Sequence, residues 1–403
     1  MKDRLFRLVL ALVLFHGMVL PAHSQTPKPQ ASTPMAVNIV HGPFGIHMHD
    51  IRSDGLNTLY VNGLWANYYG IAASLATNHD RYLALYISIF GGYPAYVQEA
   101  ANASSLSGQP IAPGVEWTID LPGSPQNRES HVYLLRVFPA EFDAMIKSLA
   151  PYATSPNAAY GLKSDWTGKP NSDALLGELE ALSKQYHEVL VVAHADIHEP
   201  SLVINHYNPI PADKLKGKVD YIGVEVMNHE LNSTPQGILN IAAAYEAAGI
   251  HVCLIGGNDT HGLPLDFPPF YPNRWERRNW FIGPTNRPDY HTGSVVTYGD
   301  ELRVTNCAPI PNLATVTSEL VLQLSSRPAF TNLTWSVWSD MTCTKQLAGG
   351  PVPPTGLIRW SIPPTLNPHG VHHRYFMMVQ GHDPVTGKSY PEVYVSPQEV
   401  VGP

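Results

Sequence analysis

Two histidines and a carboxylate near the start of the chain have the types and the spacing to bind a metal ion. His47 and His49 are separated by one residue, and Asp54 follows in a Ser-Asp-Gly turn. In an extended strand, residues i and i+2 point to the same side, so both imidazoles can face one ion. The turn lets the carboxylate fold back toward them. The alternative is a strand end with two unrelated histidines, because histidine is also common in cores and on surfaces.

Other histidines and carboxylates farther along the chain extend this set. Imidazole and carboxylate ligands together suit zinc, manganese or iron. The set is too large for one tetrahedral ion, so it predicts two or three divalent ions that share a bridging carboxylate and generate a hydroxide nucleophile. We expect Asp54, His79, Glu116 and Asp259 to take part in catalysis. The predicted metal ligands are His47, His49, Asp54, His79, Glu116, His131, His194, Asp259 and His261.

Short apolar runs that alternate with helical patterns must position these side chains. Leucines fall on one face of a helix expected over 172–186, and the apolar run 189–193 follows it. Such alternation predicts βα units and a largely parallel sheet or barrel. The carboxyl ends of the strands then meet at one rim. The residues at or just after those ends are His47, His49, His79, Glu116, His194, Glu225, Asp259 and His261. Strands are expected at 37–49, 73–77, 111–116, 131–138, 189–193, 219–227 and 252–255, and helices at 64–73, 81–101 (broken), 139–149, 172–186 and 234–248.

Beyond about residue 285 the composition changes. Helical patterns become rare, and Thr, Val, Ser, Pro and Trp dominate. The chain is therefore predicted to consist of a metal-binding barrel over 37–290 and a β-rich module over 291–403. The boundary is soft, because 317–323 could form a last barrel helix. Strands are expected at 293–305, 332–338, 356–361, 374–380 and 392–396, with a turn at 384–387.

Residues 1–24 are typical of a secretory signal peptide, with three basic residues, an apolar run and small residues at the cleavage site. The apolar run is too short to span a bilayer, although an uncleaved anchor is the alternative. Residues 25–36 are expected to form a flexible leader. We therefore expect a secreted or periplasmic protein without an integral membrane span after cleavage. Cleavage would change its net charge from −8 to −10, which argues against nucleic-acid binding.

The three cysteines are compatible with export. Cys307 and Cys343 are expected to form a disulfide in an oxidising compartment. Cys253 lies in an apolar run and is expected to be a buried thiol.

The candidate ligands lie in motifs that resemble, in order, those of the PHP (polymerase and histidinol phosphatase) metallohydrolases. The resemblance covers about residues 47–262. Asn78 stands where the family usually has aspartate, and Ala195 stands where it usually has proline; both are beside ligands. The motifs are His47-x-His49 with Ser53-Asp54-Gly55, Thr77-Asn78-His79-Asp80, Pro113-Gly114-Val115-Glu116 followed by His131, Val192-Ala193-His194, Glu225-Val226-Met227-Asn228, and Gly257-Asn258-Asp259-Thr260-His261.

This resemblance implies a distorted (β/α)7 TIM-like barrel, which the small β-rich module would follow. It also implies how the ligands divide among the ions. The implied groups are His47, His49, Glu116 and Asp259 for one ion; Asp54, His79 and His261 for a second; and Glu116, His131 and His194 for a third.

Weaker candidates surround these motifs. Arg52 and Arg81 adjoin ligands and are predicted to bind an anionic oxygen of the substrate, or else to be solvated. Glu225 lies at a strand end and is predicted to be a structural group or to support a ligand. The segment 275–280 either lines the pocket with aromatic side chains or forms a surface loop.

Together these observations predict a secreted metal-dependent hydrolase that acts on a small molecule. Phosphoester hydrolysis is the first expectation. Hydrolysis of an aryl carbamate or ester at the same centre is the second, because the resemblance extends to an exported group that includes carbaryl-type hydrolases. The alternative from another class is an inactive barrel that binds a glycan or a partner. The presence of all nine ligand positions argues against that alternative.

Overall fold

The computed structural model describes most of the chain beyond residue 38. No helix among the described residues is long and apolar enough to cross a membrane. The predicted signal peptide, most of the predicted helix at 139–149 and the predicted turn at 384–387 lie outside them. The described residues are 39–53, 55–79, 93–120, 129–135, 145, 148, 172–194, 209–226, 235–261, 277–283, 290–298, 302–326, 330, 332–382 and 389–403.

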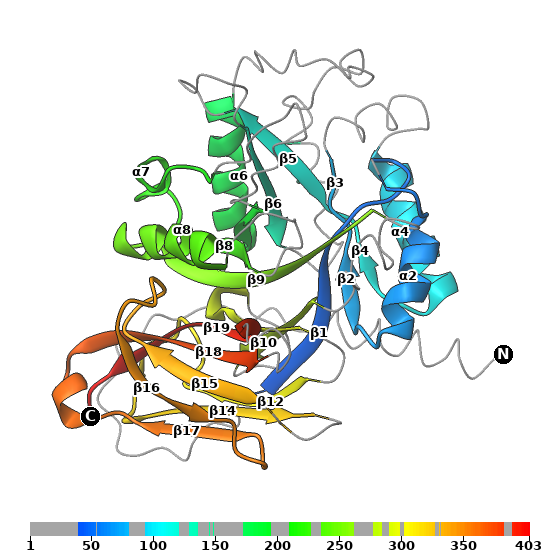
Figure 1. Ribbon diagram of the computed structural model, residues 1–403. Coiled ribbons are helices and arrows are strands. Elements are labelled where there is room, and N and C mark those ends of the chain that lie inside the picture. Colours follow the sequence, from blue (N-terminus) through cyan, green and yellow to red (C-terminus); the bar gives the residue numbers. More distant parts are fainter. Residues whose placement is uncertain are drawn as a thin grey trace, which may run out of the picture. The chain divides into compact units, whose positions relative to one another are not determined.

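Parallel strands form the centre of the main sheet (Figure 1). β7 (Val189–Ala193), β8 (Tyr221–Val226) and β9 (His251–Thr260) run parallel in this order, and β1 (Ile39–Met48) pairs in parallel with β9. β7 is buried throughout, and β8 and β9 are buried beyond their first residues. Such continuous burial is expected for parallel strands that helices cover.

The hydrogen-bonded sheet is interrupted on the other side of β1. β2 (Ala73–Leu75) pairs in parallel with β1 and with β4 (Ile111–Ala112). A few residues later, β3 (Asn78–His79) pairs in parallel with β5 (Val115–Asp120). Between β4 and β5 lies Pro113, which has no N–H to donate to a ladder. The described strands therefore do not close into a hydrogen-bonded barrel.

β6 (Glu129–Leu135) also departs from the predicted (β/α)7 repeat, because it lies antiparallel between β5 and β7. Only residues 121–128 connect β5 to β6. A parallel crossover needs a dozen or more residues, so this connection favours an antiparallel neighbour. Among the described residues, the main sheet is thus open and contains both parallel and antiparallel strands, and helices pack against it.

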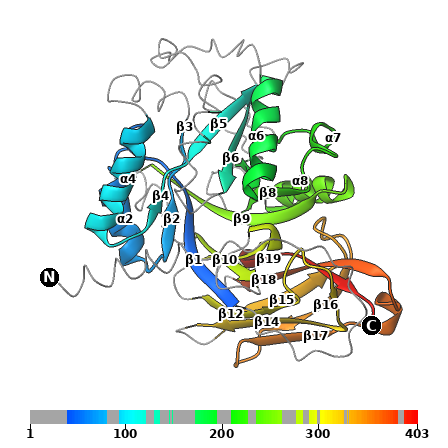
Figure 2. The same ribbon diagram turned by 180° about the vertical axis from the view of Figure 1, so that it is seen from behind.

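Helices pack against these strands (Figures 1 and 2). α6 (Ser172–Tyr186) matches its predicted bounds and packs on β5 and β7, while α8 (Pro235–Ala247) packs on β8 and β9. α2 (Leu59–Tyr68) and α4 (Tyr93–Ser107) lie side by side next to β2 and β4, and α7 is a short turn of helix, Ala212–Leu215. Each buried leucine of α6 stabilises the fold by about 1.5–3 kcal/mol. These leucines are Leu175, Leu176, Leu179 and Leu182.

The strands beyond residue 285 continue the same sheet. β10 (Arg277–Gly283) pairs antiparallel with β1, and from it the sheet extends through β11, β19, β18, β15 and β16. Strands on both sides of residue 290 thus share one sheet, and the domain boundary there stays a prediction. The bounds are β11 (Ser294–Tyr298), β15 (Leu333–Trp338), β16 (Gln346–Pro351), β18 (His372–His382) and β19 (Ser389–Val401), with short 3₁₀ turns at Tyr290–Thr292 and Pro364–Leu366.

A second sheet of three antiparallel strands contains β12 (Arg303–Ala308), β14 (Glu319–Ser325) and β17 (Leu357–Ser361). Residues from both sheets share one apolar core. The possible helix at 317–323 is wrong, because this segment lies in β14 and just after β13 (Thr315–Val316). The leucines of β14 recur at every second position and are buried, which is the period of a strand.

The predicted disulfide is also wrong, because all three cysteines are thiols. Cys307 lies in the core between the two sheets, whereas Cys343 packs beside the core that contains the helices. Their environments are therefore different apolar clusters. Burial raises the pKa of both thiols to about 12, so neither is a reactive thiolate near neutral pH.

Candidate metal centre

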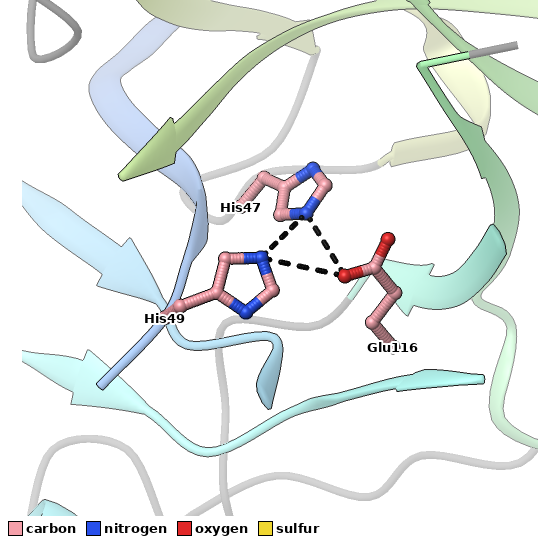
Figure 3. Close-up of side chains that lie close together, drawn as sticks. All are labelled: His47, His49 and Glu116. Carbon is pink, nitrogen blue, oxygen red and sulfur yellow. Dashed lines mark hydrogen bonds and ion pairs between the residues drawn. The ribbon is translucent and has the colours of Figure 1, made fainter. Parts of the chain in front are cut away.

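An imidazole from β1, a second one just after the end of β1 and a carboxylate from β5 form the middle of the candidate centre (Figure 3). The Nε2 atoms of His47 and His49 lie 3.1 Å apart. Oε2 of Glu116 lies 3.2 Å from Nε2 of His47 and 3.4 Å from Nε2 of His49. All three residues are buried. The two histidine side chains thus lie together, but His47 has a positive φ of 67° and His49 follows the end of β1, so simple alternation along an extended strand does not account for their alignment.

Glu116 connects two groups of histidines through its two oxygens. Oε1 lies 2.9 Å from Nδ1 of His131 and 3.0 Å from Nε2 of His194. Oε2 faces His47, His49 and Nδ1 of His79, the last at 3.3 Å. Neighbouring imidazole rings among these histidines have centroids 4.7–5.5 Å apart, so the rings encircle the carboxylate. A carboxylate in this position can bridge two ions.

The end of β9 supplies the remaining described candidates. Oδ1 of Asp259 lies 3.2 Å from Nε2 of His49 and 3.5 Å from Nε2 of His47. His261 stacks on His49 with ring centroids 4.5 Å apart. Nδ1 of His261 lies 3.0 Å from the backbone oxygen of Asp259, so it donates there and directs the Nε2 lone pair elsewhere.

The separations between these donor atoms fit metal coordination. Two ligand atoms that each lie about 2.1 Å from one ion are about 3.0 Å apart at a right angle and about 3.4 Å apart at the tetrahedral angle. The pairs around His47 and His49 span 3.1–3.5 Å. Three groups of residues place their ligand atoms within 4.8 Å of one another: His47, His49 and Glu116; His49, Asp259 and His261; His79, Glu116 and His131.

Glu225 on β8 fixes the orientation of His47. Its Oε1 lies 2.7 Å from Nδ1 of His47 and accepts a 2.6 Å hydrogen bond from the hydroxyl of Tyr133. Its Oε2 accepts the backbone N–H of His194 at 3.1 Å. A proton on Nδ1 of His47 leaves the Nε2 lone pair directed at the centre, which is how carboxylates commonly support metal-binding histidines. Gly257 makes room for this carboxylate, since an added Cβ would lie 2.5 Å from it.

Tyr133 is a residue that the sequence analysis missed. It follows His131 by two positions on β6, so the two side chains share one side of the strand. The alternation of side chains along a predicted strand could have identified it. Its hydroxyl group is buried, and burial together with the charge of Glu225 raises its pKa well above the usual value, so it stays a donor.

The backbone is strained at three positions in the centre. His47, His194 and Asp259 have φ values of 67°, 27° and 45°, in the left-handed region that non-glycine residues rarely adopt. The pairing of β1 with β9 shifts register between Ile46 and Met48, which places a bulge beside His47 and Asp259. Each such residue costs about 1–3 kcal/mol and persists only when its surroundings fix it.

The charges of the centre change several pKa values. Burial lowers the pKa of His47, but the carboxylates of Glu225, Glu116 and Asp259 raise it well above its usual value. Burial likewise opposes charge on Glu116, yet the neighbouring histidines hold its pKa well below the usual range. Hydrogen bonding to Glu116 raises the pKa of His194 to about 9 against the effect of burial. The carboxylates therefore favour positive charge here, whether it comes from protons or from metal ions.

The predicted substrate contact of Arg52 is not supported. Its side chain is buried, and it pairs with Asp50 at 2.5 Å and with Glu99. Its guanidinium carbon lies 5.2 Å from the centre of the Tyr96 ring. The altered motif residue Asn78 accepts the backbone N–H of Asp50 at 2.8 Å and donates to Tyr96. These residues tie α4 to the loop after β1.

The other predicted site residues lie outside the described part of the chain. This applies to Asp54, which is predicted as a metal ligand and catalytic residue, and to Arg81, which is predicted to bind substrate. Ala195 also lies outside it. In the segment 275–280, the described residues 277–280 are buried in β10 and do not form a surface loop.

Comparison with known proteins finds only distant similarity. No family model and no curated sequence match it. A two-domain protein from Bacteroides vulgatus with a predicted PHP-like metal-dependent phosphoesterase overlays on 92% of this chain and 100% of its own, with 12% identity and a TM-score of 0.42. A proposed metal-dependent phosphoesterase from Bifidobacterium adolescentis covers 57% of this chain and 92% of its own (17% identity, TM-score 0.34).

An amidohydrolase from Chromobacterium violaceum, solved with sulfate and no metal, covers 58% of this chain and 94% of its own, with 16% identity and a TM-score of 0.28. Because each TM-score is below 0.5, these overlays do not determine the fold or the activity.

Proposed function

We propose that this chain is a metal-dependent hydrolase with two or three divalent transition metal ions in the centre around Glu116. The main support is the contact of both Glu116 oxygens with five buried or nearly buried histidines. A buried carboxylate surrounded by imidazole nitrogens at ligand-to-ligand distances is costly unless cations compensate it. Zinc, manganese and iron all accept this donor set.

The residues of the chain have separate tasks in this proposal. His47, His49, Glu116 and Asp259 would hold one ion; Glu116, His131 and His194 would hold another; and His79 and His261 would complete the set with Asp54. Bound ions would supply Lewis acidity toward the substrate oxygen and lower the pKa of water toward about 7.

Access to the centre is uneven. The side chains of His79 and His261 are 12% and 18% exposed, whereas those of His47, His49, Glu116, His131 and His194 are at most 4% exposed. The substrate would therefore approach on the side of His79 and His261. The buried side, with Glu225 and Tyr133, would hold the ligands in place and exclude water.

Phosphoester hydrolysis is our first proposal for the reaction, and hydrolysis of an aryl carbamate or ester is the second. In both reactions, bound ions would stabilise the negative charge that develops on a substrate oxygen. The alternative remains an inactive protein that binds a glycan or a partner. From the predicted signal peptide, we propose that the enzyme is periplasmic or secreted.

Metal analysis of the purified full-length protein tests the proposal. After incubation with manganese or zinc and removal of free metal, we expect at least one equivalent of bound ion per chain. The loaded protein should hydrolyse p-nitrophenyl phosphate, a phosphodiester or an aryl carbamate. Hydrolysis of the carbamate alone would reverse our preference, and less than one equivalent of metal would refute the enzyme proposal.

Variants assign the activity to this centre. His49→Ala and Asp259→Ala should each abolish turnover and lower the metal content, while circular dichroism should show a retained fold. His372→Ala is a matched control, because this histidine lies on β18, is 61% exposed and pairs with Glu399. Unchanged turnover in both site variants would refute the assignment.

A further inference from the structure

An exposed apolar surface begins beside the metal centre and continues along α2. Large apolar side chains are exposed at Ile51, Leu56, Tyr60, Leu64 and Tyr68, which we call the apolar strip. Four other large apolar residues are exposed in the described part of the chain, and they are spread over residues 106–371. Exposed apolar side chains concentrated in one segment commonly mark a binding surface.

The helical part of the strip is a continuous face. Tyr60, Leu64 and Tyr68 are spaced by four residues, so they lie above one another on the same side of α2. This face is about 12 Å long at 1.5 Å per residue. The opposite side of the helix packs inward through Asn62, Gly63 and Ala66. The helix therefore already packs against the protein through its other side, and the apolar strip is its outward side.

Two hydrogen bonds to backbone oxygens of candidate metal ligands hold the near end of the strip beside the centre. The N–H of Leu56 donates to the backbone oxygen of His261 at 2.5 Å. The side-chain amide of Asn62, in the first turn of α2, donates to the backbone oxygen of His49 at 2.8 Å. His261 is the most exposed candidate ligand among those described. The strip thus starts on the side from which the centre can be reached.

We propose that the substrate of this centre carries an extended apolar group, such as an acyl or alkyl chain, which lies along the apolar strip while the ester group lies at the ions. This inference rests on the proposed function and names the class of its substrate. The hydrolysed bond would then join a small charged or polar group to the apolar one. Burial of methylene groups on the strip would supply binding energy for catalysis.

The charge of α2 favours this occupant over a membrane surface. Residues 59–68 contain no acidic and no basic side chain. Helices that lie on membranes are usually rich in lysine and arginine on their polar side, because these residues attract anionic lipids. A neutral, apolar face that leads to a metal centre fits a single amphiphilic molecule better.

Chain-length preference tests the inference. We would compare kcat/KM for methyl and decyl p-nitrophenyl phosphate in the metal-loaded full chain, below the aggregation concentration of the decyl compound. The wild type should prefer the decyl compound by about tenfold or more, a typical effect of apolar contacts. The double variant Leu64→Ser/Tyr68→Ser should reduce this preference by at least about fivefold. The matched control Val316→Ser/Val371→Ser, at exposed apolar residues outside the strip, should keep it.

A binding measurement separates this inference from the proposed hydrolysis. By calorimetry, the loaded wild type should bind decyl phosphate at least about tenfold more tightly than methyl phosphate, and the double variant should lose this difference. Equal binding of both phosphates would overturn the inference, whatever the turnover. A retained preference without turnover would support it and refute the hydrolase. Turnover of the decyl compound only when it is aggregated, with binding to lipid vesicles that the double variant loses, would overturn it in favour of a membrane contact.

Discussion

Glu225 offers a sharp test of how the centre is held, because it is buried, carries charge and is not itself a candidate ligand. Glu225→Gln keeps the size of the side chain but replaces one acceptor oxygen with an NH2 group. Both carboxylate oxygens are in use, since one faces His47 and Tyr133 and the other accepts the N–H of His194. In either orientation, the amide therefore places a donor against a donor.

The cost follows from these contacts. A hydrogen bond to a charged group is worth about 1.5–3 kcal/mol. If the NH2 group faces His47, Nδ1 must accept and the proton moves to Nε2, which removes the lone pair needed for a metal. Loss of such a supporting carboxylate typically lowers metal affinity by about 10–100-fold, which corresponds to about 1.4–2.7 kcal/mol.

The assay is competition for zinc or manganese with a chelator of known affinity, together with circular dichroism of the same samples. Glu180→Gln is the matched control, because Glu180 is a nearly buried carboxylate on α6 that faces Lys218 instead of the centre. Tyr133→Phe removes only one donor to Glu225 and should have a smaller effect in the same direction. A folded Glu225→Gln protein with wild-type metal affinity would refute the reasoning.

Two further predictions concern the space and the charge around the same carboxylate. Gly257→Ala should destabilise the fold by about 1–3 kcal/mol and weaken metal binding, because the added Cβ would clash with Glu225. The control Gly177→Ala, in α6, meets no atom within 4 Å and should stabilise the fold by about 0.5–1 kcal/mol. Thermal unfolding measures both changes, and equal effects would contradict the clash. Without metal, the raised pKa values of His47 and His194 stabilise the fold below the unfolded pKa near 6.5, and this contribution is lost as the pH rises through the folded pKa, about 9 for His194. Metal binding releases these protons, so the difference in Tm between loaded and chelator-treated protein should widen between about pH 6.5 and about pH 9; a constant or shrinking difference would argue against His47 and His194 as metal ligands.

Local sequence patterns predicted those parts of the fold that depend on short-range periodicity. α6 and β7 have their predicted bounds, because each is set by its own apolar spacing. Most candidate ligands could be grouped for a related reason: they lie at or just after the ends of apolar runs, and parallel strands bring such positions together. His131 is an exception, because it precedes its apolar run in the antiparallel β6. The segment of β14 also fitted a helix, because a short apolar segment is compatible with both the helical and the strand period. Only its pairing with β12 and β17 distinguishes the two.

Interactions between distant residues could not be read in the same way. The partner of Arg52 on α4, Glu99, is 47 positions away, so the sequence showed a cation next to a ligand motif but not the ion pair that it forms. Tyr133 and Glu225 are separated by 92 positions. The positive φ of His47 depends on the bulge between β1 and β9, which only the pairing of two remote strands creates.

The position of β1 in the sheet has a consequence for how the protein can lose its centre. This strand carries His47 and leads directly into His49, and its two sides are hydrogen-bonded to β9 and β2 at one end and to β10 at the other. Amide protons in such a strand exchange only when neighbouring strands separate. Local opening of the metal-binding segment therefore has a high free-energy cost, and its loss should coincide with cooperative unfolding of β2, β9 and β10, the strands to which β1 is hydrogen-bonded.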